Sequence, residues 1–574
     1  MKILLVALNS KYIHSNPAVY SLKAYADEIL HQCCDPAEMP GIEIAEYTVN
    51  QPLNRIMADI YRKTPDLLFI SCYIWNREEA EMLAADMGKI RPELDIWLGG
   101  PEVSFDAEEV LERLPAVKGV IRGEGEKAFA RIVRAYCGGS SFNDALAEIT
   151  DLTFREASGG IAVTGESGRI DFDTVPFPYK ELDSFSNRII YYESSRGCPF
   201  RCSYCLSSVD KKLKFRSAER VKPELQFFLD RKVPQVKFID RTFNCSHEHA
   251  GEIWRYIREN DNGITNFHFE IAADLMTEEE IELLGTMRPG QVQLEIGVQS
   301  TNDKTLKEIN RPMDFDRVCE VVSAIRAVNN IHLHLDLIAG LPFEDILSFR
   351  SSFNDIFALR PHQLQLGFLK VLKGSPMDRK SESYGLRYTD APPYEVLSTN
   401  WISYEELMGL KGVEEMVEVY YNSGQFIESV ELLLGAFDDA FSFFETLACW
   451  YREHGMDMIN LSRNQRYENL LEFGMAYASA GELMDALIYD FYSRENVKSR
   501  PEFFGRETVE KEYSKEFYRL EASDHRILGS PECIDADVRL LRRLTHIEKL
   551  GGRYYLFDYT QRDPMTNNAR VVEL

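Results

Sequence analysis

Three cysteines, Cys198, Cys202 and Cys205, form a C-x3-C-x2-C pattern directly after an apolar, strand-like run. Cysteine thiolates hold iron–sulfur clusters, and because a cubane has four irons, three cysteines leave one iron open to bind a further ligand. A zinc knuckle and three unrelated structural cysteines are the alternatives. Zinc usually takes a fourth Cys or His at short spacing, and the next candidates, Cys245 and His247, lie far along the chain. The spacing therefore favours a cluster with an open iron, and both alternatives stay open at this point.

The chain that must position this loop is long and acidic. Its 574 residues allow about three or four domains, and 45% hydrophobic with 27% charged residues is typical of a globular protein. We expect a cytoplasmic protein, because no apolar run has the length of a membrane span, the first residues look like a strand, and the 11 cysteines lack a disulfide framework. A formal charge of −27 disfavours nucleic acid as a partner, although a local basic patch could still serve a tRNA.

The first part of the chain alternates apolar runs at residues 3–8, 42–47, 67–72, 96–98 and 119–121 with helical patterns such as 77–90 and 106–114. This alternation predicts a doubly wound, Rossmann-like parallel sheet over residues 1–140. Such sheets bind ligands beyond the carboxyl ends of their strands. The residues expected there are Ser71, Tyr73, Trp75, Gly99, Gly100, Pro101, Glu102, Gly123 and Glu124. A Gly-Gly pair taken alone is more typical of a tight turn.

A second alternating series follows a linker at residues 141–186, for which we expect a β-hairpin between 150–154 and 160–164. Six strand-like runs begin near residues 189, 236, 267, 292, 333 and 363. Six strand–helix units predict a partial (β/α)6 barrel over residues 187–384, with its chemistry at the carboxyl ends of the strands. The cysteine loop follows the first of these strands, where a site-forming loop belongs.

From residue 385 to residue 574 the pattern becomes mostly α-helical. Ser403 and Glu406 predict a capping box, and apolar periodicity recurs through 425–436, 437–454, 466–480 and 482–493. Gly551 and Gly552 indicate a closing hairpin. The aromatic residues of this region are more typical of a helical core than of a cofactor cage.

The cysteine pattern with its aromatic Tyr204 resembles the radical S-adenosylmethionine (SAM) superfamily, and the motifs at residues 295–311 and 336–342 resemble the fourth and fifth strands of its barrel. This resemblance implies that the cysteines hold a [4Fe–4S] cluster that splits SAM to a 5′-deoxyadenosyl radical. The glycine-glycine-glutamate motif for the SAM amino group is absent, and residues 240–244 take its place. The positions that match SAM contacts are Tyr204, Asp240, Thr242, Glu295, Gln299, Arg311 and Ile338. No residue is assigned to catalysis.

The doubly wound domain ahead of this core resembles the cobalamin-binding subclass, because residues 99–102 and 122–126 are close to forms common there. In this context the glycines are expected to face cobalamin. The D-x-H-x-x-G signature that supplies a histidine to cobalt is absent. Tyr73 and Trp75 are expected to wall the lower face, while His14 is more typical of a loop histidine than of a cobalt ligand. The C-terminal region resembles an uncharacterised domain of one cobalamin group.

The resemblance implies methylation of an unactivated carbon in a small-molecule or peptide substrate, with a reductant such as flavodoxin or ferredoxin and no membrane partner. Three alternatives belong to other classes. They are radical ring formation or rearrangement without methyl transfer, methylthiolation of a nucleoside, and a non-catalytic cobalamin or redox sensor. Methylthiolation is weakened because the upstream cysteines lack a second cluster-binding arrangement. The sequence does not name the substrate.

Overall fold

The structure is a computed structural model that describes residues 1–33, 39–137, 142–167, 170–209, 213–497, 499–506 and 509–574. The chain forms two compact units. Unit 1 contains Met1–Leu275, Ile309–Arg311 and Leu369–Leu397, and unit 2 contains Met276–Glu308, Pro312–Phe368 and Ser398–Leu574. Three segments distant in sequence therefore build unit 1. The predicted domain boundary at residues 140 and 141 lies outside the described residues.

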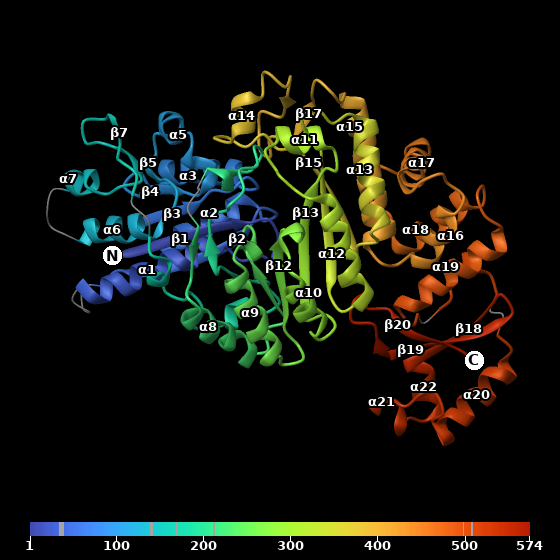
Figure 1. Ribbon diagram of the computed structural model, residues 1–574. Helices are drawn as coiled ribbons and strands as arrows, with labels where there is room; N and C mark the ends of the chain where they lie inside the picture. The colour runs from blue at the N-terminus through green and yellow to red at the C-terminus, as the bar shows by residue number, and fades with distance from the viewer. Residues whose placement is uncertain (34–38, 138–141, 168–169, 210–212, 498, 507–508) are drawn as a thin grey trace. The chain divides into compact units, whose positions relative to one another are not determined.

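Unit 1 begins with a seven-stranded sheet in the order β2-β1-β3-β4-β5-β6-β7, whose first five strands pair in parallel (Figure 1). Alternate side chains of β1 enter two separate cores, one on each face. This arrangement confirms the doubly wound prediction. The strands are β1 (Lys2–Asn9), β2 (Gly41–Thr48), β3 (Leu67–Ser71), β4 (Asp95–Gly99) and β5 (Val117–Ile121). Helices α1 (Pro17–Cys33) and α6 (Glu126–Cys137) contribute to one core, and α2 (Leu53–Lys63), α3 (Arg77–Ile90) and α5 (Ala107–Arg113) contribute to the other.

The predicted hairpin is present as β6 (Leu152–Arg155) and β7 (Ile161–Val163). Strand β6 pairs antiparallel with β5, so the hairpin extends the first sheet. The segment expected to be a linker is therefore partly a sheet edge. Short helices α4 (Pro101–Ser104) and α7 (Phe142–Ala147) complete this region.

All six strands predicted for the second series are present. In unit 1, β11 (Gln235–Phe238) pairs in parallel with β8 (Ile190–Tyr192) and β12 (Asn266–Ile271). In unit 2, β14 (His332–Ala339) pairs in parallel with β13 (Val292–Gln299) and β15 (Gln363–Phe368). The helices between them are α8 (Ala218–Asp230), α9 (His247–Glu259), α10 (Glu278–Gly285), α11 (Asp303–Glu308), α12 (Phe315–Val328) and α13 (Ile346–Ala358). The strand–helix alternation expected of a (β/α)6 core is thus confirmed.

The segment Leu369–Leu397 returns the chain from unit 2 to unit 1, and we call it the strap. It contains α14 (Pro376–Lys380) and the short strands β16 (Arg387–Tyr388) and β17 (Val396–Ser398), whose last residue already belongs to unit 2. Lys373 Nζ lies 2.7 Å from Asp106 Oδ2, beside the N-terminus of α5. Arg77 Nη2 lies 2.7 Å from the same oxygen, and its Nη1 lies 3.3 Å from Tyr394 Oη. The strap is therefore fixed to the first domain by a largely buried polar network.

The rest of unit 2 is a helical region followed by a small sheet. Ser403 and Glu406 form the predicted capping box of α15 (Tyr404–Met416), and a π-helical turn, Val417–Asn422, continues it. Helices α16 (Ile427–Leu434), α17 (Ala440–Glu453), α18 (Arg463–Gly474) and α19 (Ala480–Arg494) follow. Among the described residues, no helix combines the length and the apolar composition that a membrane crossing requires.

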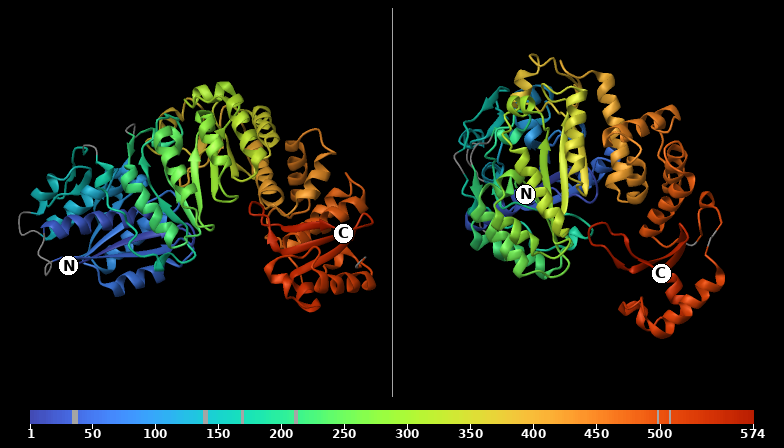
Figure 2. Two further views of the ribbon diagram at one scale, coloured as in Figure 1. Left: turned by 60° about the horizontal axis from the view of Figure 1, so that its bottom comes forward. Right: turned by 45° about the vertical axis from the view of Figure 1, so that its right-hand side comes forward.

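The predicted closing hairpin is present as β18 (Thr545–Leu550) and β19 (Arg553–Arg562), and a third strand, β20 (Ala569–Glu573), pairs with β19. Helices α20 (Lys511–Asp524), α21 (Pro531–Ile534) and α22 (Val538–Leu544) share a core with this sheet (Figure 2). The sequence analysis missed β20, because residues 569–573 (ARVVE) form a run of only five residues in which apolar and charged side chains do not alternate.

Asp490 on α19 is a buried acidic residue that binds the first turn of α16. Its carboxylate accepts hydrogen bonds from the backbone N–H groups of Glu428 and Ser429, at 3.0 and 2.9 Å, and from Ser429 Oγ at 2.7 Å, which caps α16. Burial raises the pKa of Asp490 to about 7. The folded state therefore holds a proton that the unfolded chain, with a pKa near 3.9, has lost. Stability should fall as pH rises from about 4 to about 7, by at most about 1.4 kcal/mol per pH unit.

Asp490→Asn is expected to remove this pH dependence from the urea-unfolding midpoint of unit 2. Glu468→Gln, which changes an exposed residue of α18, should keep the wild-type slope. An unchanged slope in the Asp490 variant would contradict the assignment.

Candidate functional site

The three cysteines lie in unit 1, on the loop after β9 (Ser195–Arg196). Cys202 is buried, and Cys198 and Cys205 are half-buried. Burial raises the pKa of the Cys198 thiol, and nearby Cys202 and Cys205 add to this effect. Tetrahedral zinc, with Zn–S bonds of about 2.3 Å, brings its sulfur ligands to about 3.8 Å from one another. Among the described residues, the only set of three or more ligand groups within 4.8 Å of one another is formed by other residues. At least two of the three cysteine sulfurs are therefore more than 4.8 Å apart, which is wider than the spacing in a tetrahedral zinc site.

The loop is held from two distant parts of the chain. Ser203 N donates to Ile309 O at 2.8 Å, and Asn310 Nδ2 donates to Arg201 O at 2.9 Å. On the other side, Met377 N in the strap donates to Ser203 O at 2.8 Å. Both segments belong to unit 1, although more than 100 residues separate them from the loop.

Two residues predicted to contact SAM lie beside cluster cysteines. Arg311 Nη1 is 3.5 Å from Cys202 Sγ, and Thr242 Oγ1 is 3.5 Å from Cys198 Sγ. Tyr204 lies in the same loop, and burial raises its pKa, so its phenol stays neutral. These side chains therefore surround the space in front of the cysteine sulfurs.

Asp240, a further predicted SAM contact, is fully buried. It accepts hydrogen bonds from Ser194 N at 3.0 Å and from the hydroxyl groups of Ser194 and Ser195, both at 2.6 Å. Burial raises the pKa of this carboxyl, and the serine donors oppose that shift. In the structure Asp240 thus fixes the strand that leads into the cysteine loop.

The other three predicted SAM contacts, Glu295, Gln299 and Ile338, lie in unit 2 on β13 and β14. Glu295 is grouped with His334 and Asp336, and His334 Nε2 lies 2.9 Å from Asp336 Oδ1. The sequence analysis did not select His334 or Asp336. The period-2 pattern of residues 332–336, in which polar and apolar side chains alternate, could have indicated a polar strand face.

The loops after β3, β4 and β5 form the edge expected to bind cobalamin. Gly100 has φ +118°, and a Cβ there would lie 2.4 Å from Cys72 O, so only glycine fits. A Cβ on Gly123, which has φ +66°, would meet no described atom within 4 Å. Tyr73 and Trp75 stack with ring centroids 4.5 Å apart and an interplanar angle of 11°. An open glycine turn and a flat aromatic pair suit a broad planar ligand, and Pro101 begins α4 beside them.

Several predicted members of this edge have protein partners. Ser71 Oγ accepts from Asn16 Nδ2 at 2.9 Å. Glu102 is buried and lies 3.4 Å from Arg77 Nη1. His14 Nδ1 lies 2.6 Å from Tyr191 Oη, and burial lowers its pKa. In the described structure these groups bind neighbouring loops of the protein. Gly99 is the last residue of β4.

An ion-pair network connects this edge to the cysteine loop, and we call it the Arg196 network. The Arg196 guanidinium lies 2.6 Å from Glu126, 2.9 Å from Glu193 and 3.4 Å from Glu124. Lys214 Nζ, on β10 (Lys214–Phe215), lies 2.6 Å from Glu124. Since Arg196 directly precedes Gly197 and Cys198, the network ties the turn after β5 to the base of the cysteine loop.

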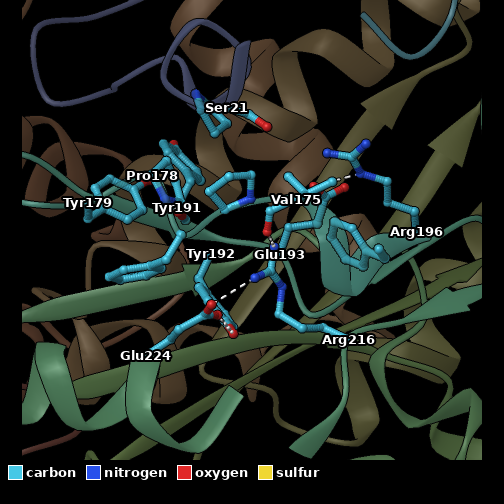
Figure 3. Close-up of a pocket in the computed structure, with 14 residues that line it drawn as sticks. Ser21, Val175, Pro178, Tyr179, Tyr191, Tyr192, Glu193, Arg196, Arg216 and Glu224 are labelled. Atoms are coloured by element: carbon cyan, nitrogen blue, oxygen red, sulfur yellow. Dashed lines mark hydrogen bonds and ion pairs between the residues drawn. The ribbon is translucent and has the colours of Figure 1, made fainter. Parts of the chain in front are cut away.

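Next to the network lies a cavity of about 40 Å³. Figure 3 shows Arg196 on the right of the lining residues and Tyr179 and Tyr191 on the left, with Glu193 between them. The volume is far below the roughly 300 Å³ at which small-molecule pockets begin and suits about one water molecule. This cavity is therefore not the substrate site.

The fold and the site define a class: a cluster-binding strand–helix core preceded by a doubly wound ligand-binding domain. Comparison with protein families agrees. Models of the B12 binding domain, of the radical SAM superfamily and of a protein of unknown function (DUF4080) match residues 3–133, 192–356 and 382–572. The chain therefore combines a B12 binding domain at residues 3–133 with a radical SAM domain at residues 192–356.

Two methyltransferases are among the curated relatives of this chain. The cobalamin-dependent radical SAM methyltransferase TokK of Streptomyces tokunonensis is 26% identical over 351 residues, which cover 56% of this chain and 50% of TokK. The 2-(S-pantetheinyl)-carbapenam-3-carboxylate methyltransferase of Streptantibioticus cattleyicolor is 25% identical over 410 residues, covering 62% of this chain and 57% of that protein. The chain thus spans about half the length of the curated relatives it matches.

Among solved structures, the cobalamin-dependent SAM radical enzyme OxsB with aqua-cobalamin bound matches with a TM-score of 0.60 and 15% identity, covering 86% of this chain and 84% of OxsB. The radical SAM methyltransferase TsrM from Kitasatospora setae matches with a TM-score of 0.56 and 15% identity, covering 68% of this chain and 80% of TsrM. At these identities the likeness concerns the fold.

Proposed function

We propose that this protein is a cobalamin-dependent radical SAM methyltransferase that methylates an unactivated carbon of a small-molecule or peptide substrate. The observation that carries the proposal is the Arg196 network. It joins the ligand-binding edge of a B12 binding domain to the base of a three-cysteine loop within one compact unit. A fixed relation between the two sites is what a reaction that uses both cofactors requires. The methyltransferase names of TokK and of the carbapenam relative support the reaction type.

In this proposal Cys198, Cys202 and Cys205 hold the [4Fe–4S] cluster. When bound, the cluster and SAM supply a substrate radical, and cobalamin supplies the methyl group. The Arg311 guanidinium and the neutral Tyr204 phenol border the space where SAM would bind. Burial and nearby Glu193 raise the pKa of Tyr73 to about 12, so the aromatic pair Tyr73–Trp75 presents an uncharged wall to the corrin. An external one-electron donor such as flavodoxin or ferredoxin is part of the proposal.

The test does not require the substrate. The full chain is reconstituted anaerobically with iron, sulfide and hydroxocobalamin, then incubated with a reductant and SAM labelled with ¹³C in its methyl group. We expect label in the recovered cobalamin together with S-adenosylhomocysteine. Formation of 5′-deoxyadenosine without any label in cobalamin would favour ring formation or rearrangement instead. Cofactor binding without any SAM consumption would favour the sensor and overturn the proposal.

A further inference from the structure

The guanidinium of Arg311 contacts the sulfur of Cys202, and binding of SAM alone does not account for this contact. Resting on the proposed function, and in particular on a cluster at the three cysteines, we propose that Arg311 sets the reduction potential of that cluster by donating a charge-assisted hydrogen bond to the Cys202 sulfur. It thereby eases reduction before SAM binds. Its Nη1 lies 3.5 Å from Cys202 Sγ.

The backbone around Arg311 is anchored on both sides of Cys202. Ile309 O accepts from Ser203 N at 2.8 Å, and Asn310 Nδ2 donates to Arg201 O at 2.9 Å. Asn310 adopts φ +55°, a left-handed conformation that an asparagine tolerates well. Two consecutive residues therefore bind the two neighbours of Cys202, and the next residue directs its guanidinium at the sulfur between them.

This placement is specific to one of the three cysteines. Thr242 Oγ1 approaches Cys198 Sγ at 3.5 Å, but the same hydroxyl lies 2.8 Å from Arg241 O, so its single hydrogen is shared between two acceptors. Arg311 has no such ambiguity, because a guanidinium can only donate and carries a permanent positive charge. Its five N–H donors also make the sulfur contact compatible with a role toward the SAM carboxylate.

The positive charge of Arg311 is expected to affect how easily the cluster is reduced. A cluster gains one negative charge on reduction, and part of it resides on the cysteine sulfurs. Hydrogen bonds to those sulfurs and nearby positive charge stabilise the reduced form and raise the potential. A half-buried guanidinium is less screened by water than an exposed one, so its effect on the cluster is larger.

The chain offers a matched control. Arg201 is adjacent to Cys202 in sequence but exposed, so Arg201→Gln removes the same charge without removing a sulfur contact. Arg311→Gln removes the charge and replaces the guanidinium with a shorter, neutral amide, and Arg311→Lys keeps the charge without the planar fork.

The experiment is an EPR-monitored redox titration of the full reconstituted chain in the absence of SAM, with iron content measured in each sample. For Arg311→Gln we expect at least a tenfold lower ratio of reduced to oxidised cluster at a fixed potential, which is about 59 mV for a one-electron couple. Arg311→Lys should fall between Arg311→Gln and the wild type, and Arg201→Gln should match the wild type.

Unchanged potentials in both Arg311 variants with a full complement of iron would overturn the inference. Equal shifts in the Arg201 and Arg311 variants would do the same, since net charge alone would then account for them. If Arg311→Gln does not retain its cluster, the potential of Arg311→Lys relative to the wild type tests the inference. Absence of a cluster from the wild type would instead count against the proposed function.

Discussion

Replacing Cys202 by alanine is expected to abolish SAM cleavage while leaving cobalamin binding in place. Cys202 is the buried member of the cysteine loop, and the segments Ile309–Arg311 and the strap both bind the residue after it. In the proposed ligand set its loss removes a direct ligand, whereas loss of an outer partner of a metal site costs about 10–100-fold. We expect 5′-deoxyadenosine formation to fall by more than about 100-fold, together with the iron and sulfide content of the protein.

Cys245→Ala is the matched control. Cys245 is also half-buried and lies near Cys198, and it is the nearest alternative to a three-cysteine site. A cluster held by Cys198, Cys202 and Cys205 predicts wild-type iron content and SAM cleavage in this variant. Loss of iron in Cys245→Ala, with retention in Cys202→Ala, would show that the ligand set has been assigned wrongly.

Arg196→Met should destabilise unit 1 by about 3–5 kcal/mol, the range found when one partner of a buried ion pair is removed. Arg196 contacts Glu126, Glu193 and Glu124, of which Glu126 is buried. Burial raises the pKa of Glu126, but Arg196 and Ser21 outweigh burial, so the pKa is lowered. In the wild type this carboxylate contributes stability above the unfolded pKa of about 4.3, and the contribution is lost as pH falls through the folded pKa.

In the Arg196→Met variant the pKa shift of Glu126 is expected to change from lowered to raised. Burial without the guanidinium raises the pKa of Glu126, so the destabilisation should be largest near neutral pH and should shrink as the carboxyl groups are protonated in acid. The measurement is urea unfolding of the full chain at pH 7 and pH 4.5, with hydrogen exchange to identify the transition of unit 1. Arg113→Met, which breaks the more exposed ion pair with Glu81, should cost no more than about 1 kcal/mol. Equal costs for both variants would contradict a buried network.

The strands and the cysteine loop were predictable because their signals are local. Apolar runs such as residues 3–8 and 67–71 are buried strands in the structure, and the cysteines lie within eight residues of one another. The glycine turns after β4 and β5 were predictable for a similar reason, since Gly100 and Gly123 adopt positive φ at the carboxyl ends of strands.

What could not be predicted depends on contacts between distant segments. The contact of Glu102 with cobalamin stays a prediction, whereas the contact of its partner Arg77 with Tyr394 could not be predicted, because no local pattern connects the strap to the first domain. Arg311 was selected as a carboxylate ligand, but its approach to Cys202 depends on the anchors at Ile309 and Asn310. Strand β20 also depends on its partner, because a strand of only five residues gains its stability from pairing with β19.

The strap has a consequence for the order of synthesis. The backbone bonds that hold the cysteine loop come from Ile309 and Met377, so neither can form while the ribosome has produced only the first 300 residues. At about 5–20 residues per second, synthesis of the stretch up to Leu397 takes about a further 5 to 20 seconds. During this time the doubly wound domain can already fold. The B12 binding domain is thus complete before the cysteine loop receives its final support, and maturation of the cluster belongs to the later stages of the protein's assembly.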